Sequence, residues 1–178
     1  DHLGKGYEKQ DRSVVRYGRP IEKRLELHIY SNRTVGWCLT TKHPIVGTRG
    51  TLEGLAGISQ DLRSPNMSRA EYDEIADSTE WVLNNLSAPP TLIQMVERTG
   101  LSPFKLNRRF QRIYGLNVGQ WILKQRVDLA QRLLRETGQE IVDIAFEAGY
   151  SDQSAFTRVF RQATGVTPKK FRMMAVSH

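Results

Sequence analysis

The chain has 178 residues, 39% of them hydrophobic, and its 26 Lys and Arg against 19 Asp and Glu give a formal net charge of +7 and a pI near 9.8. This composition excludes wholesale disorder, and the single cysteine, Cys38, excludes an intrachain disulfide framework and a cysteine-rich zinc site. Because the sequence has neither an apolar run of about 18 residues nor a signal-peptide pattern, we expect a cytoplasmic protein whose basic surface binds an anion, either nucleic acid or a membrane surface.

The first third of the chain has a β-like pattern. Apolar and polar residues alternate over 25–30 and over 35–40, and Ser31-Asn32-Arg33 between them favours a turn. Pro44 and the stretch 46–50 then interrupt the pattern before a third apolar run, 52–62. We predict strands around 22–30 and 34–42 and a third strand after them. Three antiparallel strands bury little apolar surface, which favours part of a larger domain.

The composition changes at Arg63-Ser64-Pro65-Asn66, where we place the boundary between residues 1–64 and 65–178. Ser68 and Glu71 form a capping box, helical spacing follows, and Pro89-Pro90 must end that helix. Residues 1–75 hold twelve Lys and Arg against ten Asp and Glu, whereas residues 76–178 hold fourteen against nine. Most of the excess positive charge therefore lies in the helical part.

An internal repeat is the most informative signal. Ile93-x-Met95-Val96-x-x-x-Gly100-Leu101-Ser102 recurs 49 residues later as Val142-x-Ile144-Ala145-x-x-x-Gly149-Tyr150-Ser151, and after one extra residue Leu106-x-Arg108-x-Phe110 recurs as Phe156-x-Arg158-x-Phe160. Each copy is typical of a short helix, a turn at the glycine and a second helix with its N-cap at Ser102 or Ser151. We predict helix-turn-helix units at about 77–115 and 140–165.

Between the two units the sequence predicts a linker helix over about 117–136, ended by Gly138, with Trp121 as a core residue; a final helix is predicted at about 167–175. A linker of about 18 residues spans about 27 Å, which would hold two recognition helices about one DNA turn apart. The predicted fold class is therefore α+β, an all-α C-terminal domain of two helix-turn-helix subdomains joined by a long linker helix and preceded by a small antiparallel β segment.

The second helix of each unit is expected to bury Leu106 and Phe110, or Phe156 and Phe160, and to expose the residues between them. Arg, Asn, Gln, Ala, Thr and aromatic side chains occupy these exposed positions, and such residues contact base edges in the major groove. One copy alone fits an ordinary helical hairpin with a solvated face about equally well. Two copies with matched arginines favour DNA.

Residues from about Ala76 to Arg172 resemble the DNA-binding domain of AraC/XylS-type transcription regulators. The resemblance is carried by residues 141–161 and by Gly165-Val166-Thr167-Pro168-Lys169-Lys170-Phe171-Arg172; the first copy departs from the family pattern at Val96 and Pro103. The resemblance to this family implies a sequence-specific bacterial regulator that is not an enzyme, holds no cofactor or metal and lies at the nucleoid. The implied partners are double-stranded operator or promoter DNA, RNA polymerase and a second copy of the chain, but no membrane.

The resemblance also implies site residues. The base-reading positions fall on Phe104, Asn107, Arg108, Gln153, Ser154, Ala155 and Arg158. The positions expected to contact phosphate, which the start of the final helix also favours, are Ser102, Lys105, Arg112, Ser151, Thr157, Arg161, Lys169 and Lys170.

The β segment, with Lys42-His43-Pro44-Ile45 and Gly50-x-x-x-Gly54-Leu55-x-Gly57-Ile58-Ser59-x-Asp61-Leu62, resembles the closing half of a PAS sensor domain. This implies a partial sensing or dimerising segment over 1–64 that takes a small-molecule effector, with its opening elements before Asp1.

Two interpretations are less favoured by the sequence. One is a metal or haem held by His28, His43 or Cys38, and the other is a Cys38 that accepts an alkyl group. The alternative function is a protein- or ligand-binding adaptor that has lost DNA binding.

Overall fold

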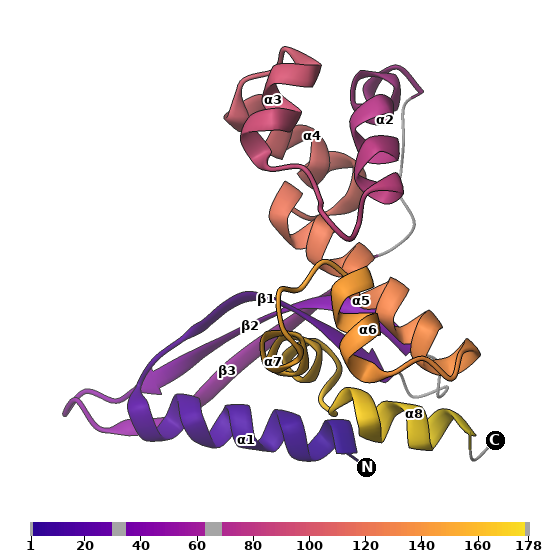
Figure 1. Cartoon of the computed structure of the whole chain (residues 1–178). Helices are drawn as coiled ribbons and strands as arrows, with labels where there is room; N and C mark the ends of the chain where they lie inside the picture. The colour runs from indigo at the N-terminus through magenta and orange to yellow at the C-terminus, as the bar shows by residue number, and fades with distance from the viewer. Residues whose placement is uncertain (1, 30–34, 63–68, 177–178) are drawn as a thin grey trace. The chain divides into compact units, whose positions relative to one another are not determined.

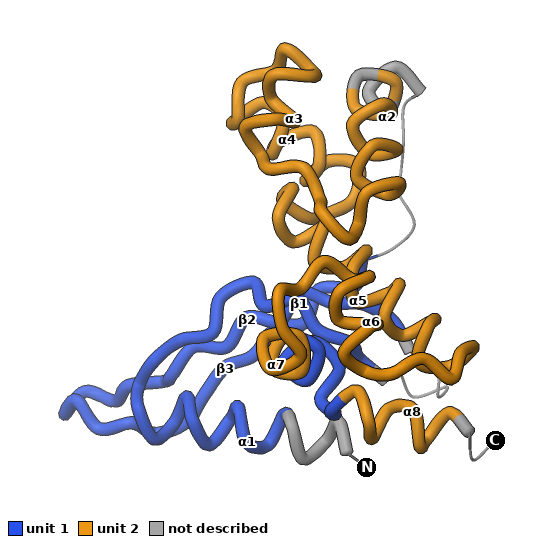
Figure 2. The backbone as a smooth tube through the Cα atoms, in the orientation of Figure 1, with its two compact units in different colours: residues 1–62, 160–167 blue, residues 63–159, 168–178 orange. Residues whose placement is uncertain are grey.

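The computed structural model describes residues 2–29, 35–62 and 69–176 (Figure 1). These residues fall into two compact units, 1–62 with 160–167 and 63–159 with 168–178 (Figure 2). The predicted turn at 31–33, the boundary at 63–66 and the cap at Ser68 lie outside the described residues. In the part of the chain that is described, none of the helices combines the length and the apolar character needed to cross a membrane.

The elements alternate little, because strands and helices are segregated along the chain. Within the described residues, helix α1 precedes three strands, and seven helices follow them. Their bounds are α1 His2–Tyr17, β1 Ile21–Ile29, β2 Val35–Val46, β3 Leu52–Asp61, α2 Arg69–Asn84, α3 Leu92–Thr99, α4 Pro103–Tyr114, α5 Val118–Glu136, α6 Ile141–Glu147, α7 Gln153–Thr164 and α8 Pro168–Val176. This mixture of helices with a small antiparallel sheet confirms the coarse fold class.

The sheet has the order β1-β2-β3 with both pairs antiparallel, as predicted. Strand β2 differs from the prediction because it continues through Pro44 to Val46. Pairing with β1 reaches only Ile21 opposite Lys42, so Pro44 has a partner on the β3 side alone, opposite Leu55. A proline is tolerated where a strand has one free edge, since its missing N–H then costs no ladder hydrogen bond. The chain reverses instead at 47–50, where Gly50 has a φ of 75°.

Helix α1 was not predicted, and it lies against the sheet (Figure 1). Its inward positions follow helical spacing from Tyr7 through Gln10 and Asp11 to Val14, of which Val14 is fully buried. Two of these four residues are polar because the sheet face they meet is polar as well. An apolar stripe, the usual sign of a packed helix, is therefore missing from the sequence of α1.

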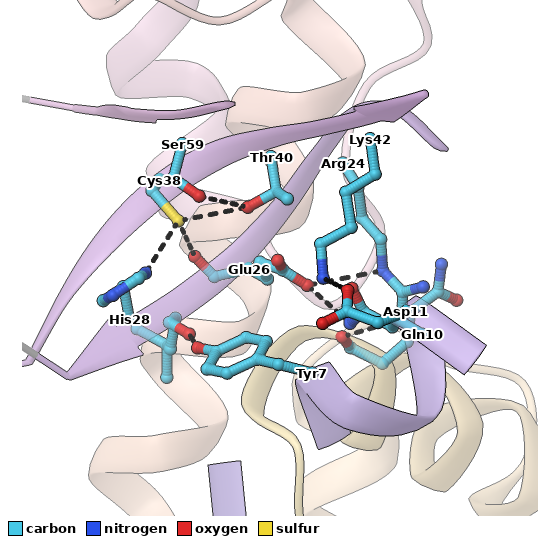
Figure 3. A network of polar contacts seen from close by, with 12 residues as sticks. Tyr7, Gln10, Asp11, Arg24, Glu26, His28, Cys38, Thr40, Lys42 and Ser59 are labelled. Atoms are coloured by element: carbon cyan, nitrogen blue, oxygen red, sulfur yellow. Dashed lines mark hydrogen bonds and ion pairs between the residues drawn. The ribbon is translucent and has the colours of Figure 1, made fainter. Parts of the chain in front are cut away.

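A network of polar side chains fills the contact between α1 and the sheet (Figure 3). The Glu26 carboxylate, only 3% exposed, accepts a hydrogen bond from Gln10 Nε2 at 2.9 Å and lies 3.6 Å from Arg24 Nε. Lys42 Nζ pairs with Asp11 Oδ1 at 2.5 Å. Each buried charge therefore has a partner of opposite sign, which offsets part of its desolvation cost.

The Cys38 thiol lies in the same network and is 0% exposed, with Sγ 3.5 Å from Thr40 Oγ1 and 3.9 Å from His28 Nδ1 (Figure 3). Burial raises the pKa of this thiol. Because the thiolate is the reactive form, a buried neutral thiol disfavours the alkyl-acceptor reading. Among the described residues, no three His, Cys, Asp or Glu side chains form a group that could hold a metal ion.

The raised pKa of Cys38 predicts a loss of stability at alkaline pH. Above about pH 8.5 an unfolded chain releases the thiol proton whereas the folded chain keeps it, so the unfolded state binds fewer protons and the free energy of unfolding falls as pH rises. We expect urea unfolding followed by circular dichroism to show a steeper decline between pH 7.5 and 9.5 for the wild type than for Cys38→Ala. An equal decline in the free energy of unfolding of the two proteins would mean that the Cys38 thiol does not have a raised pKa in the folded chain.

Candidate nucleic-acid interface

The first helix-turn-helix unit is built by α2, α3 and α4, which pack on one another. Thr91 caps α3 through a capping box with Gln94, and Gly100 ends it in the left-handed conformation at φ 66°, with its N–H donating to the Val96 carbonyl at 2.9 Å. Ser102 then caps α4 by accepting from the Lys105 N–H at 3.3 Å. The predicted glycine turn and the predicted Ser102 cap are both confirmed.

Helix α4 buries one face and exposes the other. Leu106 and Phe110 are buried, as predicted, together with Ile113. Trp121 of α5 is 4% exposed and meets the Phe110 ring edge-on, with 5.3 Å between ring centroids. Trp121 is thus a core residue, and through it the first turn of the linker helix packs against the first recognition helix.

Linker helix α5 ends two residues before Gly138 and without a left-handed glycine. Its last residue is Glu136, and Thr137, in an extended conformation, is the C-cap. Both the Thr137 N–H and its hydroxyl donate to the Leu133 carbonyl, at 3.0 and 2.7 Å. A threonine that satisfies a terminal carbonyl in this way removes the need for the predicted glycine cap.

The second unit repeats the helix, glycine turn and helix of the first, but its caps differ. Helix α6 has Glu140 as its N-cap, without a side-chain cap hydrogen bond, and Ala148 as its C-cap, and α7 starts differently from α4. Gly149 has a φ of 77°, as expected for the turn. The N-cap, however, is Asp152, whose Oδ1 accepts from the Ala155 N–H at 2.7 Å, so the predicted cap at Ser151 is wrong. The extra residue of the second copy lies between the glycine and the helix, which makes Asp152 the counterpart of Ser102.

The cap at Asp152 predicts a local stability effect. Asp152→Ala removes the acceptor for an N-terminal N–H of α7 and is expected to cost about 1 kcal/mol of the free energy of unfolding. Ser151→Ala, the adjacent control, should change it by less than about 0.5 kcal/mol. Urea unfolding measures the free energy of unfolding of both variants. A larger loss for Ser151→Ala than for Asp152→Ala would mean that Ser151 is the N-cap of α7.

Most of the predicted site residues lie on the outer faces of α4, α7 and α8. Phe104, 73% exposed, and Arg108 are one helical turn apart on α4, and Ser154 and Arg158 are likewise one turn apart on α7. The remaining exposed ones are Ser102, Lys105, Arg112, Ser151, Gln153, Arg161 and Lys169, and the half-buried ones are Ala155, Thr157 and Lys170. Each recognition helix therefore presents its own row of candidate contacts.

Asn107 differs from the other base-reading candidates, because its amide is used inside the protein. Nδ2 donates to the Pro103 carbonyl at 3.1 Å, and Oδ1 accepts from the Val118 N–H at 3.1 Å. This second bond joins α4 to the first residue of α5. The geometry therefore favours a joint between two helices at Asn107 rather than a base contact.

The sequence interpretation missed Arg126, a half-buried residue of α5. Its guanidinium donates from Nε to the Ala148 carbonyl and from Nη2 to the Gly149 carbonyl, each at 2.5 Å, and lies 3.8 Å from the centroid of the Tyr150 ring. The only signal in the sequence is its position one turn before the buried Ala130, on the inward side of an otherwise amphipathic helix.

Comparisons with known proteins agree with this arrangement. Residues 95–174 match a family model described as a helix-turn-helix domain. The chain is 32% identical over 109 residues to the multiple antibiotic resistance protein MarA of Escherichia coli (strain K12), covering 60% of this chain and 86% of MarA.

Two solved structures share the fold. The DNA-binding domain of AdpA, a global transcriptional factor, in complex with a target DNA has a TM-score of 0.55 at 27% identity, covering 58% of this chain and 94% of that one. A transcriptional regulator described by its AraC-type DNA-binding domain, from Chromobacterium violaceum, has a TM-score of 0.55 at 22% identity, covering 61% of this chain and 96% of that one. The matched region of the family model lies in the repeated helical part of this chain.

Proposed function

The chain belongs to the AraC/XylS-type family of transcription regulators, and we propose that it binds specific duplex DNA through α4 and α7, each placed in a major groove. The observation that carries the proposal is the duplicated helix-turn-helix, in which each second helix buries its apolar face and exposes an arginine, Arg108 or Arg158, at the matching position. AdpA, a structural relative, is seen in complex with a target DNA.

We assign base reading to the exposed residues of the two recognition helices. Arginine can make a bidentate contact with guanine, glutamine with adenine, and an aromatic ring or a methyl group can lie against the thymine methyl. The readers are Phe104 and Arg108 on α4, and Gln153, Ser154, Ala155 and Arg158 on α7. Asn107 is retained as a positioning residue.

Phosphate contacts would set the register of the protein on the duplex. Lys169 lies in the first turn of α8, where the positive end of the helix dipole also attracts phosphate. The other proposed contacts are Ser102, Lys105, Arg112, Ser151, Thr157, Arg161 and Lys170. The excess of cations in residues 76–178 supports this assignment.

The resemblance of the helical part to the family and that of the β segment to a PAS domain support four further proposals. These are RNA polymerase as the protein partner, a second copy of the chain as another, a position at the bacterial nucleoid, and control by a small-molecule effector through the PAS-like segment 1–64. The adaptor that has lost DNA binding is less well supported, because it gives no reason for the matched arginines Arg108 and Arg158 on the two exposed faces.

Selection of bound sequences from a random duplex pool tests DNA binding directly. We expect a site with two half-sites, and affinity that falls with salt at a slope of log K against log salt of about −5 to −7, for six to eight neutralised phosphates. An adaptor would show no saturable binding to any duplex. Titrations at two salt concentrations therefore separate the two functions.

Arg158→Ala is expected to weaken binding to the selected site by about 1–3 kcal/mol and to relax specificity at one base pair, because its bidentate contact is lost. Lys169→Ala should instead weaken binding to all duplexes by a similar factor. The measurement is a titration of both variants against the selected site and its single-base substitutions. If Arg158→Ala kept the wild-type base preference at every position of the site, Arg158 would not be a base-contacting residue.

A further inference from the structure

The turn of the second helix-turn-helix is held by two other segments of its compact unit. One is Arg126 of α5, whose two hydrogen bonds end on the carbonyls of Ala148 and Gly149. Because these are consecutive carbonyls of the turn, the planar guanidinium fixes the direction of the backbone and not merely its distance from α5.

The Tyr150 ring covers the same guanidinium, whose carbon lies 3.8 Å from the ring centroid. The ring also meets that of Phe156 of α7 at a tilt of 50°, with 5.4 Å between the two ring centroids. Burial lowers the pKa of Arg126, in keeping with its inward position. The side chain therefore touches the turn through two hydrogen bonds and the start of the recognition helix through an aromatic ring.

The second segment is the chain that follows α2. A Cβ placed on Gly149 would lie 2.4 Å from the Leu86 carbonyl oxygen and 3.1 Å from that of Ser87. The turn thus touches the backbone between α2 and α3 of the first helix-turn-helix unit, in which α2 packs on α3 and α4. The two helix-turn-helix units are joined at a second place besides the linker helix.

We propose that Arg126 is a positioning residue that clamps the turn of the second helix-turn-helix to α5 and to residues 86–87, so that both recognition helices meet DNA as one rigid body. This inference rests on the proposed function. A rigid body accepts only one separation of its half-sites, because each inserted base pair shifts the second half-site by about 3.4 Å and rotates it by about 35°. A hinged pair would accept several.

The test compares full-length wild type with Arg126→Met, which keeps the aliphatic stem but removes both hydrogen bonds. Arg132→Met is the matched control, because Arg132 is an exposed arginine of the same helix. Each protein is titrated against the selected duplex and against the same duplex with one base pair inserted between the half-sites. The readout is the ratio of the two affinities.

We expect wild type and Arg132→Met to lose at least about tenfold in affinity on insertion, and Arg126→Met to lose less than about threefold. A merely structural role would lower the folded fraction, which reduces both affinities alike and leaves their ratio unchanged. If Arg126→Met has the same ratio as the wild type, the proposal is overturned. The proposed function is not affected by that result, because the wild type still binds its bipartite site.

Two further outcomes are decisive. If Arg126→Met does not fold by circular dichroism, Arg126→Lys replaces it. Lysine keeps the charge but lacks the planar fork that holds two carbonyls in one direction, so an intermediate ratio supports the clamp and a wild-type ratio overturns it. If the wild type binds no duplex, the proposed function fails and this inference fails with it.

Discussion

Gly149→Ala should cost about 3 kcal/mol or more in the free energy of unfolding. The residue has a φ of 77°, where alanine is strained by about 1–2 kcal/mol. Its Cβ would also lie 2.4 Å from the Leu86 carbonyl oxygen, a backbone atom that cannot rotate away, so the turn or the 86–87 segment must shift. Overpacking of this kind adds about 1–3 kcal/mol. Urea unfolding followed by circular dichroism measures the sum.

Gly100→Ala is the matched control, because Gly100 is the same glycine of the first repeat. It also has a left-handed φ, 66°, but a Cβ there would meet nothing within 4 Å. Only the backbone strain of about 1–2 kcal/mol applies to it. Equal losses in the two variants would mean that the turn of the second unit is not packed against residues 86–87.

Phe110→Ala is expected to cost about 3–5 kcal/mol in the free energy of unfolding. Phe110 is 0% exposed, and its ring contacts both Tyr114 and Trp121. Removing the ring leaves a cavity between α4 and the linker helix and takes away the edge-on contact that fixes α5. Thermal unfolding should show a large fall in Tm, with a blunted change in tryptophan fluorescence because Trp121 loses its neighbour.

Phe104→Ala separates stability from DNA binding on the same helix. Because the Phe104 ring is 73% exposed, its removal should change the free energy of unfolding by less than about 0.5 kcal/mol. DNA binding should weaken, since this ring is a proposed reader. A stability loss as large as that of Phe110→Ala would show that α4 packs with a different face inward.

The sequence alone predicted the helical half of the molecule well, because that half contains a repeat. Two copies of one pattern report the same inward positions, such as Leu106 and Phe156, and the same left-handed glycines. The error at the second cap arose from the one inserted residue. The change of offset from 49 to 50 could have moved the cap from Ser151 to Asp152.

What could not be predicted depends on contacts between residues distant in sequence. Asn107 bonds Val118, eleven residues on, and Arg126 bonds carbonyls more than twenty residues away. No periodicity records such pairs. Helix α1 was missed for a different reason, since Gln10 and Asp11 pair with buried charges of the sheet and interrupt the apolar stripe by which a helix is recognised.

The two copies of the motif differ in charge, and this difference bears on how the protein finds its site. Helix α4 carries Lys105, Arg108, Arg109 and Arg112 behind the neutral cap Ser102, whereas α7 carries Arg158 and Arg161 behind the anionic cap Asp152. Attraction to the phosphate backbone is independent of sequence and allows a protein to slide along DNA. We therefore expect the first helix-turn-helix unit to supply more of the sequence-independent attraction that holds the protein on DNA while it slides. We expect the second unit to supply more of the base discrimination by which the protein stops at its site.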